Sequence, residues 1–300
     1  MSKRLLTIQD VSCVGQCSAT VALPIISACG VECAVLPSAV LSNHTGGFAS
    51  WTFHDLTGEM TRIEDEWRRQ SIKFDAFYTG YVCPSQVDPI LSILETCAAP
   101  GAVRFIDPVL GDHGKLYAGF GDDFPARMAM LCRGADYMLP NLTEAALLLG
   151  EKPVLEGYDS VFVENTIAGL HALGAKNVVL TGVSFCPDEL GVAVSDGTKI
   201  EYDFNKRLAR TRNDLNGGAS TMLFNGDVFH GTGDVFASVF SGAVMRGLSP
   251  INAAALAADF VCAAISATPP EHWYGVAFEA AMPILLKGLS SASTNDTRPF

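Results

Sequence analysis

The sequence predicts a three-layer α/β/α fold whose central sheet is largely parallel. Short runs rich in β-formers alternate with longer helical patterns along the 300 residues, and this alternation is typical of a parallel sheet covered by helices on both faces. Hydrophobic residues make up 49% of the chain, which supplies material for a large core. No internal repeat or Pro/Ser-rich linker divides the sequence, so we expect one domain at 1–290 followed by a tail at 291–300.

The expected elements follow one another along the chain. Strands are expected at 5–8, 33–37, 76–79, 103–106, 137–139 and 177–180. Helices are expected near 18–29, 62–72, 85–97, 143–149, 165–173, 234–246, 250–267 and 274–286. The runs 190–195 and 199–202 flank Asp196-Gly197-Thr198, a hairpin signal that adds antiparallel strands at one edge of the sheet. The polar stretch 207–225 is expected to be a surface connection.

The charge and the N-terminal sequence exclude several classes of partner. The 32 Asp and Glu residues outnumber the 20 Lys and Arg residues, giving a formal net charge of −12, and nucleic-acid binding depends on a basic surface. The first apolar run ends at Gln9 and Asp10, too early for a signal peptide. The uncharged stretch 11–31 contains Gln16 and several serines, which make it a weak membrane span. We therefore expect a cytoplasmic protein without nucleic-acid or membrane partners.

The cysteines predict a reduced protein. There are nine of them, an odd count without a Cys-x-x-Cys pair, and such thiols usually serve as small core residues in the cytosol. Cys13 with Cys17, and Cys29 with Cys33, stand four residues apart, which would place each pair on one face of a helix. Metal binding by these pairs stays open as an alternative.

A glycine-rich turn, Gly231-Thr232-Gly233-Asp234, directly precedes a long uncharged run that is expected to be helical. The first N–H groups of a helix lack partners within it and lie at the positive end of its dipole, so the turn can hold an anion such as phosphate. Asp234 would repel a phosphate, but it suits a general base that takes a proton from a hydroxyl beside one. For His230, one residue before the turn, a structural or nucleotide-lining role is favoured over that of the base. The motif points to phosphoryl transfer.

Two acidic segments follow expected strands. Asp107-Pro108-Val109-Leu110-Gly111-Asp112 offers two carboxylates that suit Mg²⁺, or it is an Asp-Pro turn with an exposed acid. In Asn141-Leu142-Thr143-Glu144, the Asn and Glu either steer Mg²⁺-bound water and phosphate or only cap a helix. Ligands of open α/β sheets bind beyond the carboxyl ends of the strands, so both segments are expected at one active edge.

Two more segments offer groups for a small ring. The stretch Ser42-Asn43-His44-Thr45-Gly46-Gly47 carries hydroxyl, amide and imidazole groups that can read the edge of a polar ring, or it is a plain loop. Tyr81, in Thr79-Gly80-Tyr81, can stack on a planar substrate or cap the core. His44 and His113 are better candidates than His230 for contact with substrate or phosphate.

Together these motifs resemble those of the ribokinase superfamily and, within it, the pyridoxal/pyridoxamine kinases of vitamin B6 salvage. The resemblance covers nearly the whole chain, and it rests on Ser-Asn-His-Thr-Gly at 42–46, Thr-Gly-Tyr at 79–81, Asp-Pro-Val-Leu-Gly-Asp at 107–112, Pro-Asn-x-x-Glu at 140–144 and Gly-Thr-Gly-Asp at 231–234. It implies a ribokinase-like fold and a homodimer. It also implies ATP- and Mg²⁺-dependent phosphorylation of the 5′-hydroxymethyl group of pyridoxal, pyridoxamine or pyridoxine.

The resemblance implies a role for each matched residue. Asp234 takes the proton of the substrate hydroxyl, and the amides of Gly231, Thr232 and Gly233 form the anion hole. The nucleotide-binding residues are those three together with Asp107, Asn141, Glu144, Thr181 and His230. The metal-binding residues are Asp107, Asp112 and Glu144. The substrate-binding residues are Asp10, Ser12, Asn43, Thr45, Tyr81 and Asp234, and Tyr117 belongs to the loop that covers the site.

Three segments depart from the family pattern. The segment 10–15 differs in sequence and spacing from better-known members. Leu139 stands where many members have a threonine that helps to bind a monovalent cation, which puts K⁺ dependence in question. The covering loop, 113–119, is shorter than in some relatives.

Three other functions compete with a B6 kinase. A hydroxymethylpyrimidine kinase of thiamin synthesis acts on a similar flat nitrogen ring with a primary alcohol. An ATP-dependent dehydratase that repairs hydrated nicotinamide cofactors uses the same scaffold, but it regenerates the cofactor and accumulates no phospho-product. A non-catalytic vitamer-binding protein would not need an anion hole, a base and metal ligands together.

Overall fold

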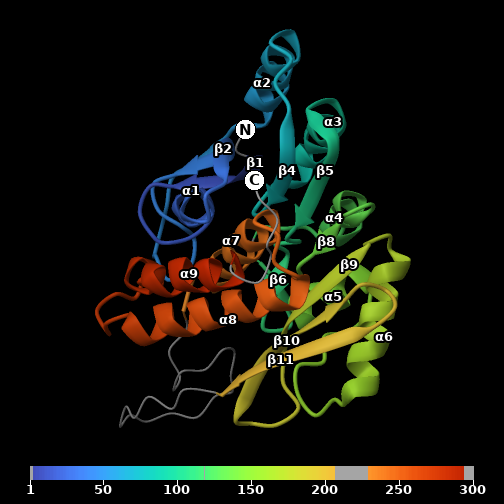
Figure 1. Ribbon diagram of the computed structural model, residues 1–300. Coiled ribbons are helices and arrows are strands. Elements are labelled where there is room, and N and C mark those ends of the chain that lie inside the picture. The colour runs from blue at the N-terminus through green and yellow to red at the C-terminus, as the bar shows by residue number, and fades with distance from the viewer. Residues whose placement is uncertain (1–2, 118, 207–228, 294–300) are drawn as a thin grey trace.

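The computed structural model describes residues 3–117, 119–206 and 229–293, and a nine-stranded sheet runs through this part of the chain (Figure 1). In sheet order the strands are β11 (Ile200–Lys206), β10 (Glu189–Ser195), β9 (Asn177–Val183), β8 (Tyr137–Met138), β5 (Ala98–Ile106), β4 (Phe74–Thr79), β1 (Arg4–Ser12), β2 (Glu32–Leu41) and β3 (Phe53–Asp55). The strands from β9 to β2 are parallel, which confirms the prediction of a largely parallel sheet. The expected hairpin is β10–β11, antiparallel to β9.

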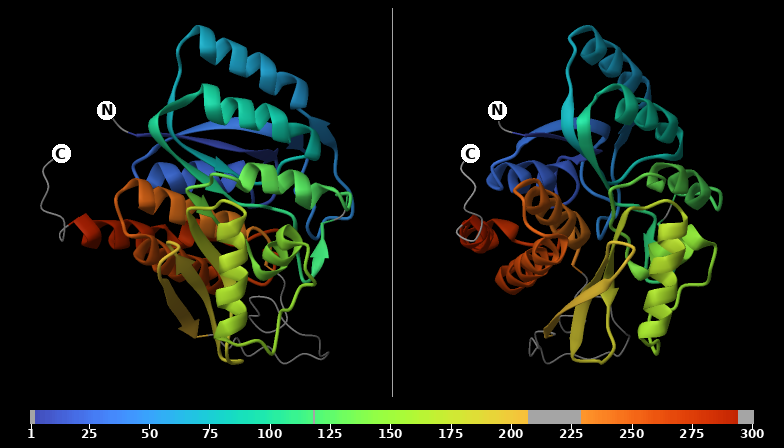
Figure 2. Two further views of the ribbon diagram at one scale, coloured as in Figure 1. Left: turned by 90° about the vertical axis from the view of Figure 1, so that its right-hand side faces the viewer. Right: turned by 45° about the vertical axis from the view of Figure 1, so that its right-hand side comes forward.

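Helices cover both faces of the sheet (Figure 2). One layer contains α1 (Ala19–Ala28), α7 (Thr232–Met245), α8 (Pro250–Ala267) and α9 (Phe278–Ser293). The other contains α2 (Thr57–Arg69), the short turn η1 (Pro84–Gln86), α3 (Val87–Thr96), α4 (Phe124–Cys132), α5 (Leu142–Leu149) and α6 (Ser160–Ala172). The predicted three-layer α/β/α architecture is therefore confirmed.

The central strands are buried on both faces. Leu5 of β1 and Tyr78 of β4 enter the core under α1 and α7, whereas their chain neighbours Leu6 and Phe77 enter the core under α2 to α6. All four side chains are fully buried. Because successive side chains of a strand point to opposite faces, these strands have no exposed face, and this explains why they are nearly continuous apolar runs in the sequence.

The second helix was placed too late in the sequence. It was expected at 62–72, but α2 spans Thr57–Arg69. The Asp55 carboxylate accepts a hydrogen bond from the Thr57 N–H at 2.6 Å, which fixes an earlier start. Only Met60 and Glu64 of α2 are buried, so its first turn carries little of the apolar pattern that marks a helix.

Several elements were missed altogether. Helix α4 follows Asp123 and has Pro125 in its first turn, a start signal that was overlooked. Strand β3 has three exposed residues and pairs antiparallel with β2, so antiparallel strands lie at both edges of the sheet, not at one edge alone. The small hairpin of β6 (Gly111–Asp112) and β7 (Lys115–Leu116) was also not expected.

Two helix boundaries differ for local reasons. Helix α6 begins at Ser160, not 165, because the Asp159 side chain caps it by accepting from the Phe162 N–H at 3.1 Å. Helix α9 was expected at 274–286 but spans Phe278–Ser293, three residues into the expected tail. Before it, the Thr268 hydroxyl accepts from the Ala277 N–H at 2.9 Å and holds that residue outside the helix. The expected surface connection at 207–225 lies outside the described residues.

Helix α8 is long and apolar enough to cross a membrane by length and composition, but it packs between α7 and α9. Its residues Ala253, Ala257, Phe260 and Ala264 belong to the core beside the sheet.

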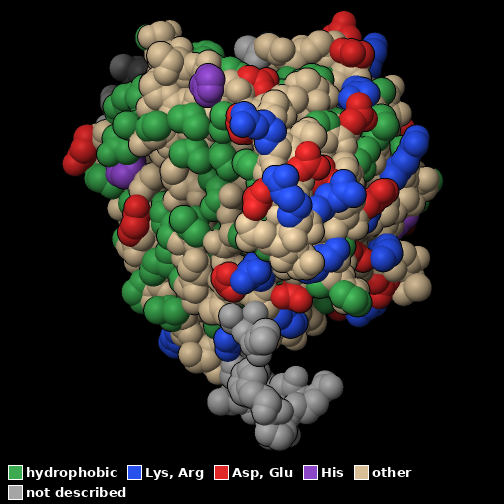
Figure 3. Space-filling view, turned by 90° about the horizontal axis from the view of Figure 1, so that it is seen from above, with side chains coloured by type: hydrophobic (Ala, Val, Ile, Leu, Met, Phe, Trp, Pro, Cys, Tyr) green, Lys and Arg blue, Asp and Glu red, His purple; other side chains and the backbone are tan. Residues whose placement is uncertain are grey.

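Seen from above, charged side chains of both signs intermix on one part of the surface and hydrophobic ones gather on another (Figure 3). The α2 pairs Arg62–Glu59 and Arg69–Glu66 are two such opposite-charge contacts.

Candidate active site

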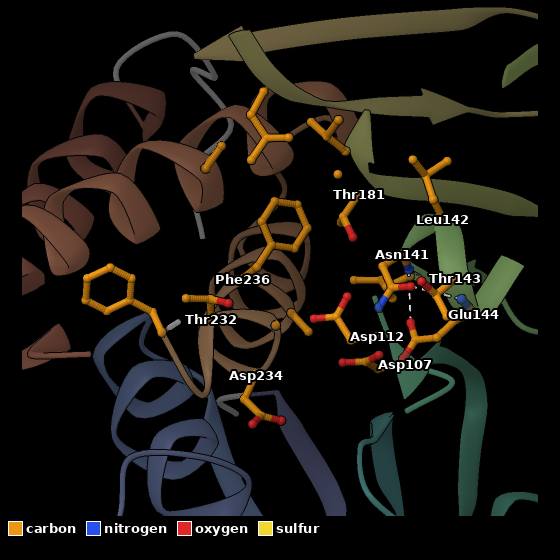
Figure 4. Close-up of a pocket in the computed structure, with 18 of the residues that line it drawn as sticks. Asp107, Asp112, Asn141, Leu142, Thr143, Glu144, Thr181, Thr232, Asp234 and Phe236 are labelled. Carbon is orange, nitrogen blue, oxygen red and sulfur yellow. Dashed lines mark hydrogen bonds between the residues drawn. The ribbon is translucent and has the colours of Figure 1, made fainter. Parts of the chain in front are cut away.

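A cavity of about 400 Å³ lies beyond the carboxyl ends of β5, β8 and β9, between the N-termini of α5 and α7 (Figure 4). It gathers all the residues that were expected to bind nucleotide or metal, together with Tyr117 of the covering loop and Asp234. These are Asp107, Asp112, Tyr117, Asn141, Glu144, Thr181, His230, Gly231, Thr232, Gly233 and Asp234. They come from segments up to 127 positions apart (Asp107 to Asp234), and the sheet brings them together because parallel strands end at the same edge.

The turn before α7 has the backbone that an anion hole needs. Gly231 is the N-cap of α7 and has φ 79°, ψ 4°, a left-handed conformation. A Cβ at this position would also overlap the backbone oxygen of Gln16, so glycine is required by both conformation and space. A Cβ at Gly233 would meet nothing within 4 Å, so its main chain is open to a ligand. Together these glycines leave the first N–H groups of α7 accessible from the cavity.

Asp234, in the first turn of α7, lines the same cavity. Burial raises the pKa of its carboxyl to about 7, a hydrogen bond from the backbone of Ser18 opposes that rise, and the nearby charge of Asp10 adds to it. Asp234 forms no ion pair with any residue that the structure describes. A carboxyl with a pKa near 7 is suited to accept a proton at neutral pH.

Across from Asp234, Asp107 and Asp112 point into the cavity from the segment after β5 (Figure 4). Asp107 is buried, and desolvation together with the charges of Glu144 and Asp234 raises its pKa well above the usual range. Asp112 is more open, with its carboxylate 3.7 Å from the His113 Nε2. No Lys or Arg side chain is among the described residues that line this cavity. Within the described lining, these acids therefore have no Lys or Arg side chain to neutralise them.

Asn141 and Glu144 form a capping box at the start of α5. The Asn141 Oδ1 accepts from the Glu144 N–H at 2.9 Å, and the Glu144 Oε2 accepts from the Asn141 N–H at 2.9 Å. The Glu144 Oε1 also accepts from the Leu110 N–H at 3.1 Å, and the Asn141 Nδ2 donates to the Gly111 oxygen at 3.0 Å. Burial nevertheless outweighs these donors and raises the pKa of Glu144 to about 8. From the sequence, a helix cap and a role at the phosphate site were alternatives. In the structure, Asn141 and Glu144 form the cap and also line the cavity.

The acids suit Mg²⁺ that arrives with a nucleotide. Among the described residues, no group of three or more His, Cys, Asp or Glu side chains is arranged to hold a metal ion by itself, and this includes the cysteine pairs. Mg²⁺ commonly keeps several waters and binds one or two carboxylates together with substrate phosphates. The carboxylates of Asp107, Asp112 and Glu144 are of the type that Mg²⁺ binds, although they do not form a closed metal site by themselves.

The residues expected to bind the substrate ring lie outside the cavity lining: Asp10, Ser12, Asn43, Thr45 and Tyr81. Asp10 is buried beside Asp234 and accepts a hydrogen bond from the Ser12 hydroxyl at 2.8 Å. The Asn43 amide donates within its own loop, to the oxygens of His44 (3.2 Å) and Ser50 (3.1 Å). Thr45 is exposed, and Tyr81 stacks on Phe120 with ring centroids 5.5 Å apart.

His44 anchors the loop that it belongs to. Its Nε2 bonds the Tyr274 oxygen at 2.8 Å, and its Nδ1 accepts from the Gly46 N–H at 3.0 Å, so both ring nitrogens are occupied. The ring also lies 5.3 Å from that of His230, which lines the cavity. A Cβ at Gly46 would overlap the His230 ring, so the glycine allows this close packing. The loop therefore contacts His230, a residue of the cavity lining, while its own residues 42–47 do not line the cavity.

Two further predicted features lie at the cavity rim. Tyr117, expected in the covering loop, lines the cavity, and its backbone N–H donates to the Leu110 oxygen at 2.9 Å. Leu139 is buried and lines the cavity with an apolar side chain.

All nine cysteines are free, and burial raises the pKa of thiols such as Cys29, to about 12.

Sequence reasoning missed the apolar wall of the cavity. Leu190, Val192, Phe229, Phe236 and Ala258 line it from β10, α7, α8 and the segment before α7. The runs 190–195 and 199–202 were predicted only as antiparallel strands at the edge of the sheet, and not as part of a ligand cavity. Ser18, which contacts Asp234, was likewise not identified, because it belongs to no recognisable motif.

Comparison with known proteins gives the family. Residues 23–276 match the family model described as phosphomethylpyrimidine kinase. A crystal structure from Bacteroides thetaiotaomicron, classed as a phosphomethylpyrimidine kinase and determined with pyridoxal, is 30% identical with a TM-score of 0.84, covering 95% of this chain and 96% of that one. The pyridoxal kinase structure from Lactobacillus plantarum is 29% identical with a TM-score of 0.80, covering 99% of each chain.

Among curated proteins, pyridoxal kinase from Dictyostelium discoideum is 28% identical over 254 residues, which are 82% of this chain and 80% of that protein. The resemblance that the motifs indicated is confirmed by these matches. With the glycine turn, the half-buried Asp234 and the acidic edge all in one cavity, the chain belongs to the phosphomethylpyrimidine kinase family of the ribokinase superfamily, and it is a kinase.

Proposed function

We propose that this kinase transfers the γ-phosphoryl group of ATP to the 5′-hydroxymethyl group of pyridoxal, pyridoxamine or pyridoxine. The observation that carries the proposal is one cavity wall on which Asp234 lies beside the open amides of the Gly231–Gly233 turn, opposite the acids Asp107 and Asp112. The pyridoxal kinases among its relatives, and the pyridoxal in the Bacteroides structure, support a B6 vitamer as the acceptor.

The apolar wall supports a purine nucleotide as the donor. Leu190, Val192, Phe236 and Ala258 offer a surface on which an adenine ring can pack. Thr181 lies between this wall and the acids, where it would approach the phosphates. The γ-phosphate would then meet the start of α7, where the N–H groups and the helix dipole stabilise negative charge.

In the proposed reaction, Asp234 accepts the proton of the substrate alcohol while the alcohol oxygen bonds to the γ-phosphorus and the bond to ADP breaks. The amides of Gly231, Thr232 and Gly233 stabilise the charge on the migrating group. Asp107, Asp112 and Glu144 would hold Mg²⁺, which when bound neutralises phosphate charge. Phosphoryl transfer depends mostly on positioning and charge neutralisation, and these groups would contribute to both.

Hydroxymethylpyrimidine is the second candidate substrate, because the matched family is named for a phosphorylated form of that ring. It presents the same primary alcohol on a flat nitrogen ring, so the anion hole and Asp234 would serve it equally well. The ATP-dependent dehydratase of the same fold is a weaker alternative, since no nicotinamide enzyme is among the relatives described above. The homodimer and the cytoplasmic location stay predictions, and the dependence on a monovalent cation stays an open question.

The test is ATP-dependent phosphorylation of pyridoxal, pyridoxamine, pyridoxine and hydroxymethylpyrimidine, measured side by side with purified protein and Mg²⁺. We expect kcat/KM for at least one B6 vitamer to exceed that for the pyrimidine by about tenfold or more. A higher value for the pyrimidine would transfer the assignment to thiamin-precursor synthesis. Formation of ADP without any phosphorylated alcohol would reject both kinase assignments.

A further inference from the structure

One wall of the cavity is formed by β10, β11 and α8, and it combines apolar side chains with an amide. The described residues that line it are Leu190, Gly191, Val192, Asn205, Ala258 and Cys262. In sheet order, β9 separates β10 and β11 from β8 and β5, so this wall lies on the far side of Thr181 from Asp107. Asn205 is therefore the strongest hydrogen-bonding side chain on a wall that is otherwise apolar or weakly polar.

The pairing of β11 directs Asn205 into this wall. Asn205 stands opposite Leu190 in the antiparallel ladder of β10 and β11. Its chain neighbour Phe204 packs against the core under α2 to α6, and successive side chains of a strand point to opposite faces of the sheet. Asn205 therefore faces the layer of α7 and α8, on the same side of the sheet as Val192.

The amide nitrogen of Asn205 is a buried donor without a partner. Its Nδ2 is closed off from solvent, yet it forms no hydrogen bond with any residue in the described part of the chain. By contrast, the Nδ2 of Asn141, which lines the same cavity, donates to the Gly111 oxygen at 3.0 Å. Buried polar groups of native proteins are almost always paired, because an unpaired donor costs free energy. An unpaired donor on a cavity wall indicates that a ligand supplies the acceptor.

Resting on the proposed function, we infer that Asn205 recognises the base of the nucleotide donor. The faces of a purine pack on Leu190, Val192 and Phe236, and the Asn205 Nδ2 donates to a ring nitrogen of the base. Adenine presents N1, N3 and N7 as acceptors, and an Asn amide is a regular partner of adenine. The turn from Gly231 to Gly233 would hold the phosphates of any nucleoside triphosphate alike, so the choice of base depends on Asn205.

The test uses Asn205→Ala, which removes the amide, and Asn205→Leu, which removes it but keeps the shape of the side chain. We expect the Kd for Mg²⁺–ATP, from equilibrium dialysis, to rise about three- to tenfold in both variants, with kcat within about twofold of wild type and the vitamer KM unchanged. The Kd for inorganic tripolyphosphate, which has no base, should not change. The melting temperature of the nucleotide-free protein should not fall in Asn205→Ala, because the amide nitrogen forms no bond with the described residues. The control Asn165→Ala, at an exposed position of α6, should change none of these values.

A second measurement identifies the acceptor on the base. The Kd values of 1-deaza-, 3-deaza- and 7-deaza-ATP, in each of which a carbon replaces one ring nitrogen, are compared for wild type and Asn205→Ala. We expect one analogue to bind wild type about three- to tenfold more weakly than ATP does, and to bind Asn205→Ala as ATP does, because the donor to that nitrogen is gone.

Three results would overturn the inference: an unchanged ATP Kd in Asn205→Ala, wild-type ATP affinity in Asn205→Leu, or the same analogue preferences in wild type and Asn205→Ala. Failure of the wild-type protein to phosphorylate any of the four acceptors would instead reject the proposed function, and the binding measurements would still test Asn205.

Discussion

The two sides of the active site differ in how their polar groups are used. We call the nucleotide side the phosphate side (Asp107, Asp112, Asn141, Glu144 and the turn Gly231 to Asp234), and the other the ring side (Asp10, Ser12, Asn43, Thr45 and Tyr81). Every phosphate-side residue lines the cavity, whereas no ring-side residue does. On the ring side, Ser12 bonds Asp10, and Asn43 bonds its own loop.

This difference shows which functions depend on the backbone. The phosphate side is built from strand ends, a capping box and a glycine turn, and these features place N–H groups and carboxylates with little help from distant side chains. On the ring side, Asn43 and Thr45 belong to a loop that is held by His44, Phe48 and Trp273, whereas Asp10 and Ser12 lie at the end of β1. We therefore expect changes on the phosphate side to slow the reaction, and changes on the ring side mainly to weaken substrate binding.

The largest effect is expected for Asp234→Asn, which keeps the shape of the side chain and removes its basicity. The kcat should fall on the order of 100-fold or more, while the Kd values for ATP and vitamer change little. Steady-state kinetics and equilibrium binding of both ligands would check this. Turnover at the wild-type rate would remove Asp234 from its role as the base.

A smaller effect is expected for Asp107→Asn, and it should concern only the binding and use of Mg²⁺–ATP. Loss of one buried negative charge should weaken Mg²⁺–ATP binding, so kcat/KM for Mg²⁺–ATP should fall roughly 10- to 100-fold. The half-saturating Mg²⁺ concentration should rise, and the vitamer Kd should stay near the wild-type value. A variant with an altered vitamer Kd and an unaltered Mg²⁺ dependence would contradict the division between the two sides.

Next in size is Gly231→Ala, which adds a Cβ at a left-handed residue where it would overlap the Gln16 backbone. We expect kcat to fall on the order of tenfold and the free energy of unfolding to fall by about 1–3 kcal/mol, because the turn must shift. Gly101→Ala is the matched control, since Gly101 also has φ 78° but its Cβ would meet nothing within 4 Å. If both variants lost activity equally, positive φ alone would be the cause, not the shape of the anion hole.

The smallest effect is expected for His44→Ala, on the ring side. The loop loses its bonds to Tyr274 and Gly46, so the vitamer KM should rise roughly two- to fivefold while kcat stays within about twofold. His54→Ala, on the exposed strand β3, is the control and should change neither value. A fall in kcat larger than the rise in KM would place His44 in the chemical step.

The same contrast explains what the sequence could predict. The parallel sheet and the phosphate-side residues follow from periodicity and from motifs whose geometry is local, such as the capping box of Asn141 and Glu144. Strand β3 was missed because its three residues are all exposed, and the start of α2 was placed too late because only Met60 is buried in its first turn. The hydrogen bonds of Asn43 within its own loop are a local feature that the motif at 42–47 does not specify. The proximity of Ser18 to Asp234 depends on packing between distant segments, which no local pattern encodes.

The most direct test of the account is the pH dependence of kcat/KM for the vitamer, measured for wild type and Asp10→Asn at limiting substrate. Asp234 must be ionised to accept a proton, and burial raises its pKa to about 7, so kcat/KM should fall about tenfold per pH unit below that value. Asp10→Asn removes a negative charge that raises this pKa, so the acidic limb should move to lower pH. A wild-type profile that stays flat down to pH 5, or a limb that moves to higher pH in Asp10→Asn, would contradict Asp234 as the base.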